Sequence, residues 1–276
     1  MELLNISPVP VLPRTMWVVL RAIMATPGGL ARDEVIDAVC PATMVVETPQ
    51  QGAHAQRALD TLIRFGLVTS ERESEQAVTA PKGEDRASFA RRLRRTLLGD
   101  PDPDASEPQP EDLRRAVAWL LSQSPNKPLD QAVADQELPG LFTNDTRWNT
   151  FRYWATFLGF GREWPLAGGG LSADPTAVVD DVLNHPASSP IERGKAIEVQ
   201  RVLLHLQAEL SILAPTMSDD SRAIAPSLAY ALRSLEHAGK VKLEGRADAP
   251  ASVTLPAGAG APNDTLVSHI TIGKAA

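Results

Sequence analysis

Hydrophobic positions in residues 54–80 follow two different periods in succession. The first part has apolar residues every three or four positions, which predicts a helix with one buried face. These positions are Ala58, Leu59, Leu62, Ile63 and Phe65. Gly66 follows, and glycine is the residue that most often ends a helix in the left-handed conformation. Two β-rich runs, 67–71 and 76–80, flank a charged turn and predict a hairpin. A helix followed by a two-stranded wing is typical of the second half of a winged helix-turn-helix.

The residues before this stretch predict two more helices. Apolar periodicity covers 15–26 and 30–40, and prolines at 27 and 41 end the two segments. Three helices followed by a hairpin is the order that a winged helix requires. Residues 84–98 predict a further helix that follows the wing in the sequence. We therefore expect residues 1–98 to form an N-terminal winged-helix domain.

A similar succession returns near the C-terminus. Pro226 suits the first turn of a helix, and Gly239 suits its end. The predicted elements are one long continuous helix over 192–213, a helix over 223–238, and strands over 240–244, 251–255 and 266–272. The last strand would join the wing. Residues 171–276 are thus predicted to form a C-terminal helical and winged-helix domain.

The middle of the chain divides into a linker and a helical domain. Residues 99–112 hold six acidic residues, four prolines and no periodic apolar positions, which predicts an extended linker. Residues 113–170 predict a helical, winged-helix-like domain that is rich in aromatic residues. Trp148, Trp154 and Trp164 are expected to form its core or an interdomain packing face, with an aromatic platform for an unpaired base as the alternative. The fold class is accordingly mainly α with small β wings, two winged helix-turn-helix units flanking a helical middle domain.

The charge pattern locates one candidate DNA-binding surface. The net charge of −7 argues against a protein that coats nucleic acids in general, but it permits a local basic patch. In the 84–98 helix the arginines lie opposite the apolar side, where they form either a solvated face or a ridge that contacts phosphates. The candidate DNA-binding residues are Arg57, Arg64, Arg91, Arg92, Arg94 and Arg95.

Motifs for catalysis and cofactor binding are missing from the sequence. There is no Walker A loop, no GxGxxG after a strand, no HExxH and no paired CxxC. We therefore expect no enzyme activity, no catalytic residue, no cofactor and no metal site. The adjacent acids Asp180 and Asp181 should point to different helix faces or act as caps, as should Asp219 and Asp220. A nuclease site built from acids that converge in space stays open as an alternative.

Cysteine usage and hydropathy bear on the compartment. Cys40 is the single cysteine, so an internal disulfide framework is excluded and a reducing compartment is favoured. No apolar run approaches the ~20 residues that span a bilayer, and the N-terminus lacks the pattern of a signal peptide. We expect a cytoplasmic protein without membrane contact.

Three segments carry a resemblance to a known family. The opening LLNISPVPVLPR before the helix with Trp17, the central FRYWATFLGFG, and the following SADPTAVVDDVL resemble DpdG-type proteins. Such proteins belong to bacterial systems that place 7-deazaguanine derivatives in DNA. The resemblance implies a component of the modification-dependent restriction part of an antiviral defence system, and it assigns no catalytic residue.

The sequence therefore predicts a non-catalytic DNA-binding or scaffolding component of such a system. Its expected partners are double-stranded DNA and other proteins of the same defence system. Two alternatives remain besides a nuclease. One is a protein–protein adaptor whose winged helices never touch DNA. The other is a winged-helix transcriptional regulator, which would need a dimer and a palindromic site.

Overall fold

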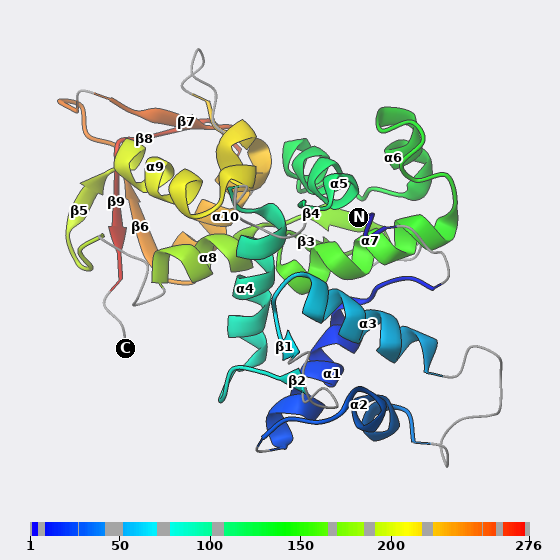
Figure 1. The fold of residues 1–276 in the computed structure, drawn as a ribbon. Coiled ribbons are helices and arrows are strands. Elements are labelled where there is room, and N and C mark those ends of the chain that lie inside the picture. Colours follow the sequence, from blue (N-terminus) through cyan, green and yellow to red (C-terminus); the bar gives the residue numbers. More distant parts are fainter. Residues whose placement is uncertain are drawn as a thin grey trace.

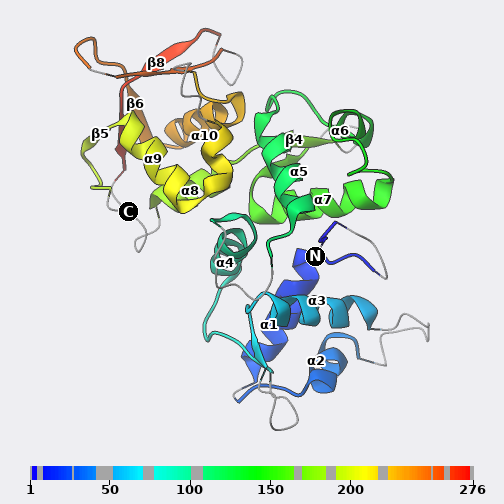
Figure 2. The ribbon, with the colours of Figure 1, turned by 45° about the horizontal axis from the view of Figure 1, so that its top comes forward.

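The protein is mainly α-helical with small antiparallel sheets, as the sequence predicts. The structure is a computed structural model that describes residues 2–4, 9–26, 28–41, 52–70, 78–100, 108–164, 170–184, 191–216, 223–249, 251–257 and 262–273. Three units lie around one central helix, α4 (Arg86–Leu98) (Figure 1). The view in Figure 2 shows the same arrangement, with α4 between the units.

The N-terminal unit contains the helix that the hydrophobic pattern singled out. Its elements are α1 (Pro13–Ala25), α2 (Arg32–Val39), α3 (Ala53–Arg64), β1 (Thr69–Ser70) and β2 (Val78–Thr79). Gly66 has a φ of 62°, and Leu67 N–H donates to the Leu62 carbonyl at 2.8 Å, so the helix ends where predicted. Leu30 pairs with Val78, which places β2 between Leu30 and β1. The predicted turn at 72–75 lies outside the described residues.

The middle unit repeats this order of elements. It consists of α5 (Glu111–Ser122), α6 (Gln131–Glu137), α7 (Asp145–Leu158), β3 (Gly161–Glu163) and β4 (Leu171–Ala173). Asn144 caps α7 by accepting a hydrogen bond from Arg147 N–H at 2.9 Å, and Gly159 ends the helix with a φ of 84°. Leu129 pairs with Leu171, so β4 lies between Leu129 and β3.

The C-terminal unit has a complete three-stranded version of the same sheet. It comprises α8 (Thr176–Asn184), β5 (Ala196–Glu198), α9 (Val199–Glu209), the 3-10 helix η2 (Ser211–Thr216), α10 (Pro226–His237), β6 (Val241–Glu244) and β9 (His269–Ile272). The strand order is β5-β9-β6. A separate two-stranded sheet pairs β7 (Val253–Leu255) with β8 (Thr265–Val267).

Two predictions for this unit need correction. The continuous helix over 192–213 is wrong, because residues 196–198 form β5 and Leu210 is extended between α9 and η2. β5 is recruited by pairing with β9, a partner that the helical period of its own residues does not reveal. The strands at 240–244 and 251–255 do not pair with each other either: β6 pairs with β9 and β7 with β8. The predicted final strand over 266–272 is divided at Ser268: β8 pairs with β7, and β9 joins β6 as expected.

Helix α4 connects the units through aromatic contacts. Trp17 of α1 stacks on Phe89 of α4 with ring centroids 5.5 Å apart. Phe89 in turn makes an edge contact at 6.1 Å with Phe157 of α7. Buried residues of all three units and α4 belong to one continuous hydrophobic core. Residues 101–107 of the predicted linker lie outside the described residues.

Candidate functional site

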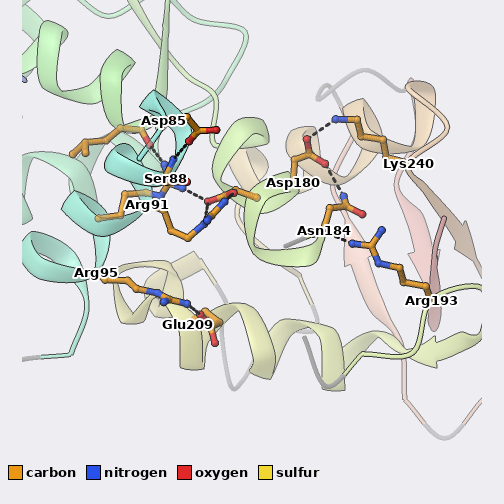
Figure 3. A network of polar contacts seen from close by, with 12 residues as sticks. Asp85, Ser88, Arg91, Arg95, Asp180, Asn184, Arg193, Glu209 and Lys240 are labelled. Carbon is orange, nitrogen blue, oxygen red and sulfur yellow. Dashed lines mark hydrogen bonds and ion pairs between the residues drawn. The ribbon is translucent and has the colours of Figure 1, made fainter. Parts of the chain in front are cut away.

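The arginine side of α4 begins at a well-formed helix cap. Asp85 accepts a hydrogen bond from Ser88 N–H at 2.7 Å, and this bond lowers the pKa of Asp85. After this cap, Arg91, Arg92, Arg94 and Arg95 follow within α4. Figure 3 shows Arg91 and Arg95 together with the cap. Each of them forms at least one intramolecular hydrogen bond or ion pair.

Arg91 and Arg94 share the carboxylate of Asp181 on α8. Arg91 Nε donates to Asp181 Oδ2 at 2.9 Å, and a second bond joins its Nη2 to Oδ1. Arg94 pairs with Oδ2 of the same carboxylate, and its Nη1 donates to the Leu158 carbonyl at 2.9 Å. Arg94 is only 5% exposed. Burial lowers the pKa of Arg94, whereas the Asp181 charge acts in the opposite direction.

Arg92 and Arg95 hold α4 to two other elements. Arg92 Nε donates to Glu84 at 2.9 Å, and its Nη1 bonds to the Leu67 carbonyl just after α3. Arg95 pairs with Glu209 of α9 at 2.7 Å, and its side chain is 53% exposed. The arginine side of α4 therefore links the N-terminal and C-terminal units.

This arrangement corrects the predicted solvation of the α4 arginines. Arg94 is buried, and Arg91 and Arg92 are half-buried. The cause is that α4 lies between units, so carboxylates of α8 and α9 cover its polar side. Asp181 is separated from Arg94 by 87 positions in sequence, and no local pattern connects them. Whether any of these arginines binds DNA stays a prediction.

The two adjacent acids of α8 do point to different partners, as the sequence predicts. Asp181 faces α4, whereas Asp180 pairs with Lys240 and accepts a hydrogen bond from Asn184 at 2.6 Å. Arg193 donates to the Asn184 carbonyl beyond it. The polar side of α8 is therefore divided between an inter-unit contact and contacts within its own unit (Figure 3). Asp219 and Asp220 lie outside the described residues.

The other two predicted arginines lie on α3. Arg57 is half-buried, and within the described part of the chain its Nε has no hydrogen-bond partner. Arg64 is exposed in the last turn. The same helix exposes His54, Gln56 and Asp60, and Asp60 is paired with Arg32 of α2. α3 thus presents a polar face to solvent over its whole length.

The equivalent helices of the other units are more covered. No residue of α10 from Pro226 to Leu235 is exposed, and Ser227 Oγ donates to the Leu121 carbonyl of α5. α7 donates from Trp154 Nε1 to the Val11 carbonyl at 2.9 Å. A duplex groove needs the first turns of such a helix to be accessible. Among the described third helices, α10 does not meet this requirement, whereas α3 exposes His54 and Gln56 in its first turn and α7 exposes Asp145 and Thr146.

The aromatic cluster of the middle unit forms its core. Trp148, Phe151 and Trp154 are buried, and Trp119 and Phe142 contact the first two of these rings. Trp164 is half-buried. The packing interpretation is therefore confirmed for Trp148 and Trp154, whose rings are not available as a base platform.

Two properties of the described residues concern metal binding and membrane crossing. No group of three or more His, Cys, Asp or Glu side chains in the described ranges has the geometry to hold a metal ion. None of the helices described here is long and apolar enough to cross a membrane.

The protein is thus a mainly helical protein in which three units with a similar order of elements lie around the arginine-bearing helix α4. The DpdG-like family model matches residues 1–249, so the chain belongs to the DpdG-like family. Membership supports a role in the Dpd 7-deazaguanine modification system. No curated protein and no solved structure matches the chain.

Proposed function

We propose that the protein is a non-catalytic DNA-binding or scaffolding component of a DNA-modification-dependent restriction system, and that each of its three units is a winged helix. The repeated topology supports this proposal. In each unit the final strand lies between an earlier strand or bridging residue and the strand that follows the third helix: Leu30–β2–β1, Leu129–β4–β3 and β5–β9–β6. This order is typical of a winged helix-turn-helix. The sequence predicted two winged-helix units and a winged-helix-like middle domain, and the proposal treats all three as winged helices.

The proposed DNA contact is the exposed face of α3. The single observation that carries it is the exposure of His54, Gln56 and Arg64, while α10 is covered over its first ten residues. Arg57 and Arg64 would bind phosphate, because a guanidinium can donate two parallel hydrogen bonds to its oxygens. Asp60 lies on this face too, and Arg32 neutralises it.

The α4 arginines have a secondary place in this proposal. A phosphate would have to displace Asp181 from Arg91 and Arg94, Glu84 from Arg92, or Glu209 from Arg95. Arg95 has the most exposed side chain of the four. Because they lie on the solvent-facing side of α3, Arg57 and Arg64 are assigned the first phosphate contacts, and Arg95 would add to them.

The internal ion pairs of α4 favour the adaptor as the second candidate function. A winged helix can bind protein instead of DNA, and here the densest arginine cluster is already matched by acids of the same chain. Binding of the intact protein to a labelled duplex, measured at about 50 and 200 mM salt, separates the two functions. DNA binding that weakens with salt supports the first function, and no binding at the lower salt supports the adaptor. Gel filtration of the same sample tests the transcriptional regulator, which requires a dimer.

A further inference from the structure

Two exposed arginines of α1 have no partner among the described residues. In the described part of the chain, neither Arg14 nor Arg21 forms a hydrogen bond or an ion pair, unlike the α4 arginines. They are seven positions apart, which is two helical turns or roughly 10 Å along the axis on the same side of α1. Val18, which is 50% exposed, lies between them. This stripe therefore presents two positive charges that nothing in the described structure neutralises.

Contacts between α1, α4 and α7 extend the stripe. Trp17, which is half-buried between the turns of Arg14 and Arg21, stacks on Phe89, and Phe89 contacts Phe157. The exposed Arg86 holds its Cζ 5.0 Å from the centre of the Phe157 ring.

Tyr153 lies one helical turn before Phe157 and is 42% exposed. We name the residues Arg14, Val18, Arg21, Arg86 and Tyr153 the α1–α4–α7 surface.

This surface faces away from α3. Helix α1 buries Met16, Leu20 and Ile23 on one side, and α3 packs against α1 more extensively than any other element does. The exposed stripe occupies the opposite side of the α1 helix. A straight duplex lying along the outer face of α3 would therefore not cover Arg14 and Arg21.

We propose that the α1–α4–α7 surface binds single-stranded nucleic acid. Its two components are those that single-strand binding combines: arginines that follow the phosphate backbone and an accessible aromatic ring on which a base stacks. Arg14, Arg21 and Arg86 supply the first component, and Tyr153 supplies the second. This site goes beyond the proposed duplex contact and does not depend on α3.

The test uses the intact protein and a labelled thymidine oligonucleotide of about 15 nucleotides, a length within the range of single-strand sites. The double variant Arg14→Ala/Arg21→Ala should lower the salt slope of binding by about 1.4, since each single-strand phosphate contact contributes about 0.7. Tyr153→Ala should weaken binding about 5- to 150-fold, and Tyr153→Phe should restore it, because stacking needs the ring and not the hydroxyl. Arg115→Ala, an exposed arginine of α5, is the matched control and should bind like the parent.

Three outcomes would overturn the proposal. One is that the parent does not bind the oligonucleotide at low salt. Another is that the Arg14→Ala/Arg21→Ala variant, with an unchanged circular dichroism spectrum, binds like the parent. The third is that Tyr153→Ala binds normally while poly-glutamate competes fully, which would make the surface a site for acidic protein segments. The variant Arg57→Ala/Arg64→Ala lacks the proposed duplex contacts on α3 and should still bind the single-stranded oligonucleotide. The two proposals can therefore fail independently of each other.

Discussion

Arg94 of α4 and Asp181 of α8 form an ion pair between two units, and Arg91 binds the same carboxylate. Arg94 also donates to the Leu158 carbonyl at the end of α7. One buried guanidinium thus joins α4 to both the middle and the C-terminal units. The contact makes the arginine helix a structural element of the fold, whatever else it binds.

Removing the carboxylate should destabilise the fold strongly. Asp181→Ala leaves Arg94 buried without its counter-charge, and losing one partner of a buried pair costs about 3 kcal/mol or more of the free energy of unfolding. Urea denaturation measures the change. Lys195→Ala, which breaks an exposed pair with Glu192, should unfold like the parent. Equal stability of the Asp181→Ala variant and the parent would show that the pair does not hold the units together.

Glycine is required where α3 ends. Gly66 has a φ of 62°, and Gly239 after α10 has a φ of 71°, a region that β-branched residues resist. Gly66→Val or Gly239→Val should each lower stability by about 1 kcal/mol or more. Asparagine tolerates this conformation better, so Gly66→Asn should lose less. Thermal melting of the four proteins checks the order, and valine variants that melt like the parent would contradict it.

The buried side chain of Asp112 should make the free energy of unfolding depend on pH. Asp112 is 8% exposed, and its carboxylate accepts hydrogen bonds from Leu4 N–H at 2.6 Å and Leu113 N–H at 2.8 Å. Burial raises the pKa of Asp112 above its ordinary value of 3.8, although the backbone N–H groups partly oppose this. The folded state therefore holds a proton at pH values where the unfolded state has lost it.

The contribution of Asp112 to stability is accordingly present below pH 3.8 and lost as the pH rises through the raised pKa. Asp112→Asn cannot titrate. The free energy of unfolding of the parent, relative to this variant, should fall with rising pH across that window. Urea titrations of both proteins at several pH values measure the difference, and parallel pH profiles would rule out the raised pKa.

Cleavage between the N-terminal and middle units should leave the fragments associated. The composition of residues 99–110, which precede α5, favours protease access. Arg91 and Arg94 would still bind Asp181, and Trp17, Phe89 and Phe157 would still pack together. Limited proteolysis followed by gel filtration should give two fragments that elute as one complex. Separate elution under non-denaturing conditions would show that these contacts are too weak.

Local pattern predicted much of the fold, and long-range pairing accounts for what it missed. The stripe of Ala58, Leu59 and Leu62 and the stop at Gly66 both occur as expected. β5 was assigned to a helix, because its strand character comes from pairing with β9 and not from its own period. The burial of Arg94 was missed for the same reason, since its acceptors on α7 and α8 are distant in sequence. Arg14 and Arg21, which have no partner among the described residues, carried no sequence signal, because lone arginines on a helix are common.

The salt dependence of duplex binding tests the central proposal most directly. The parent, the variant Arg57→Ala/Arg64→Ala and the control Arg115→Ala are titrated into a labelled DNA duplex over a series of salt concentrations. We expect the parent and the control to share one slope of the logarithm of affinity against the logarithm of salt. The α3 variant should have a slope smaller by about one to two units, because each phosphate contact contributes about 0.9. A parent that fails to bind at low salt, or an α3 variant with the parent's slope, would contradict DNA binding through α3.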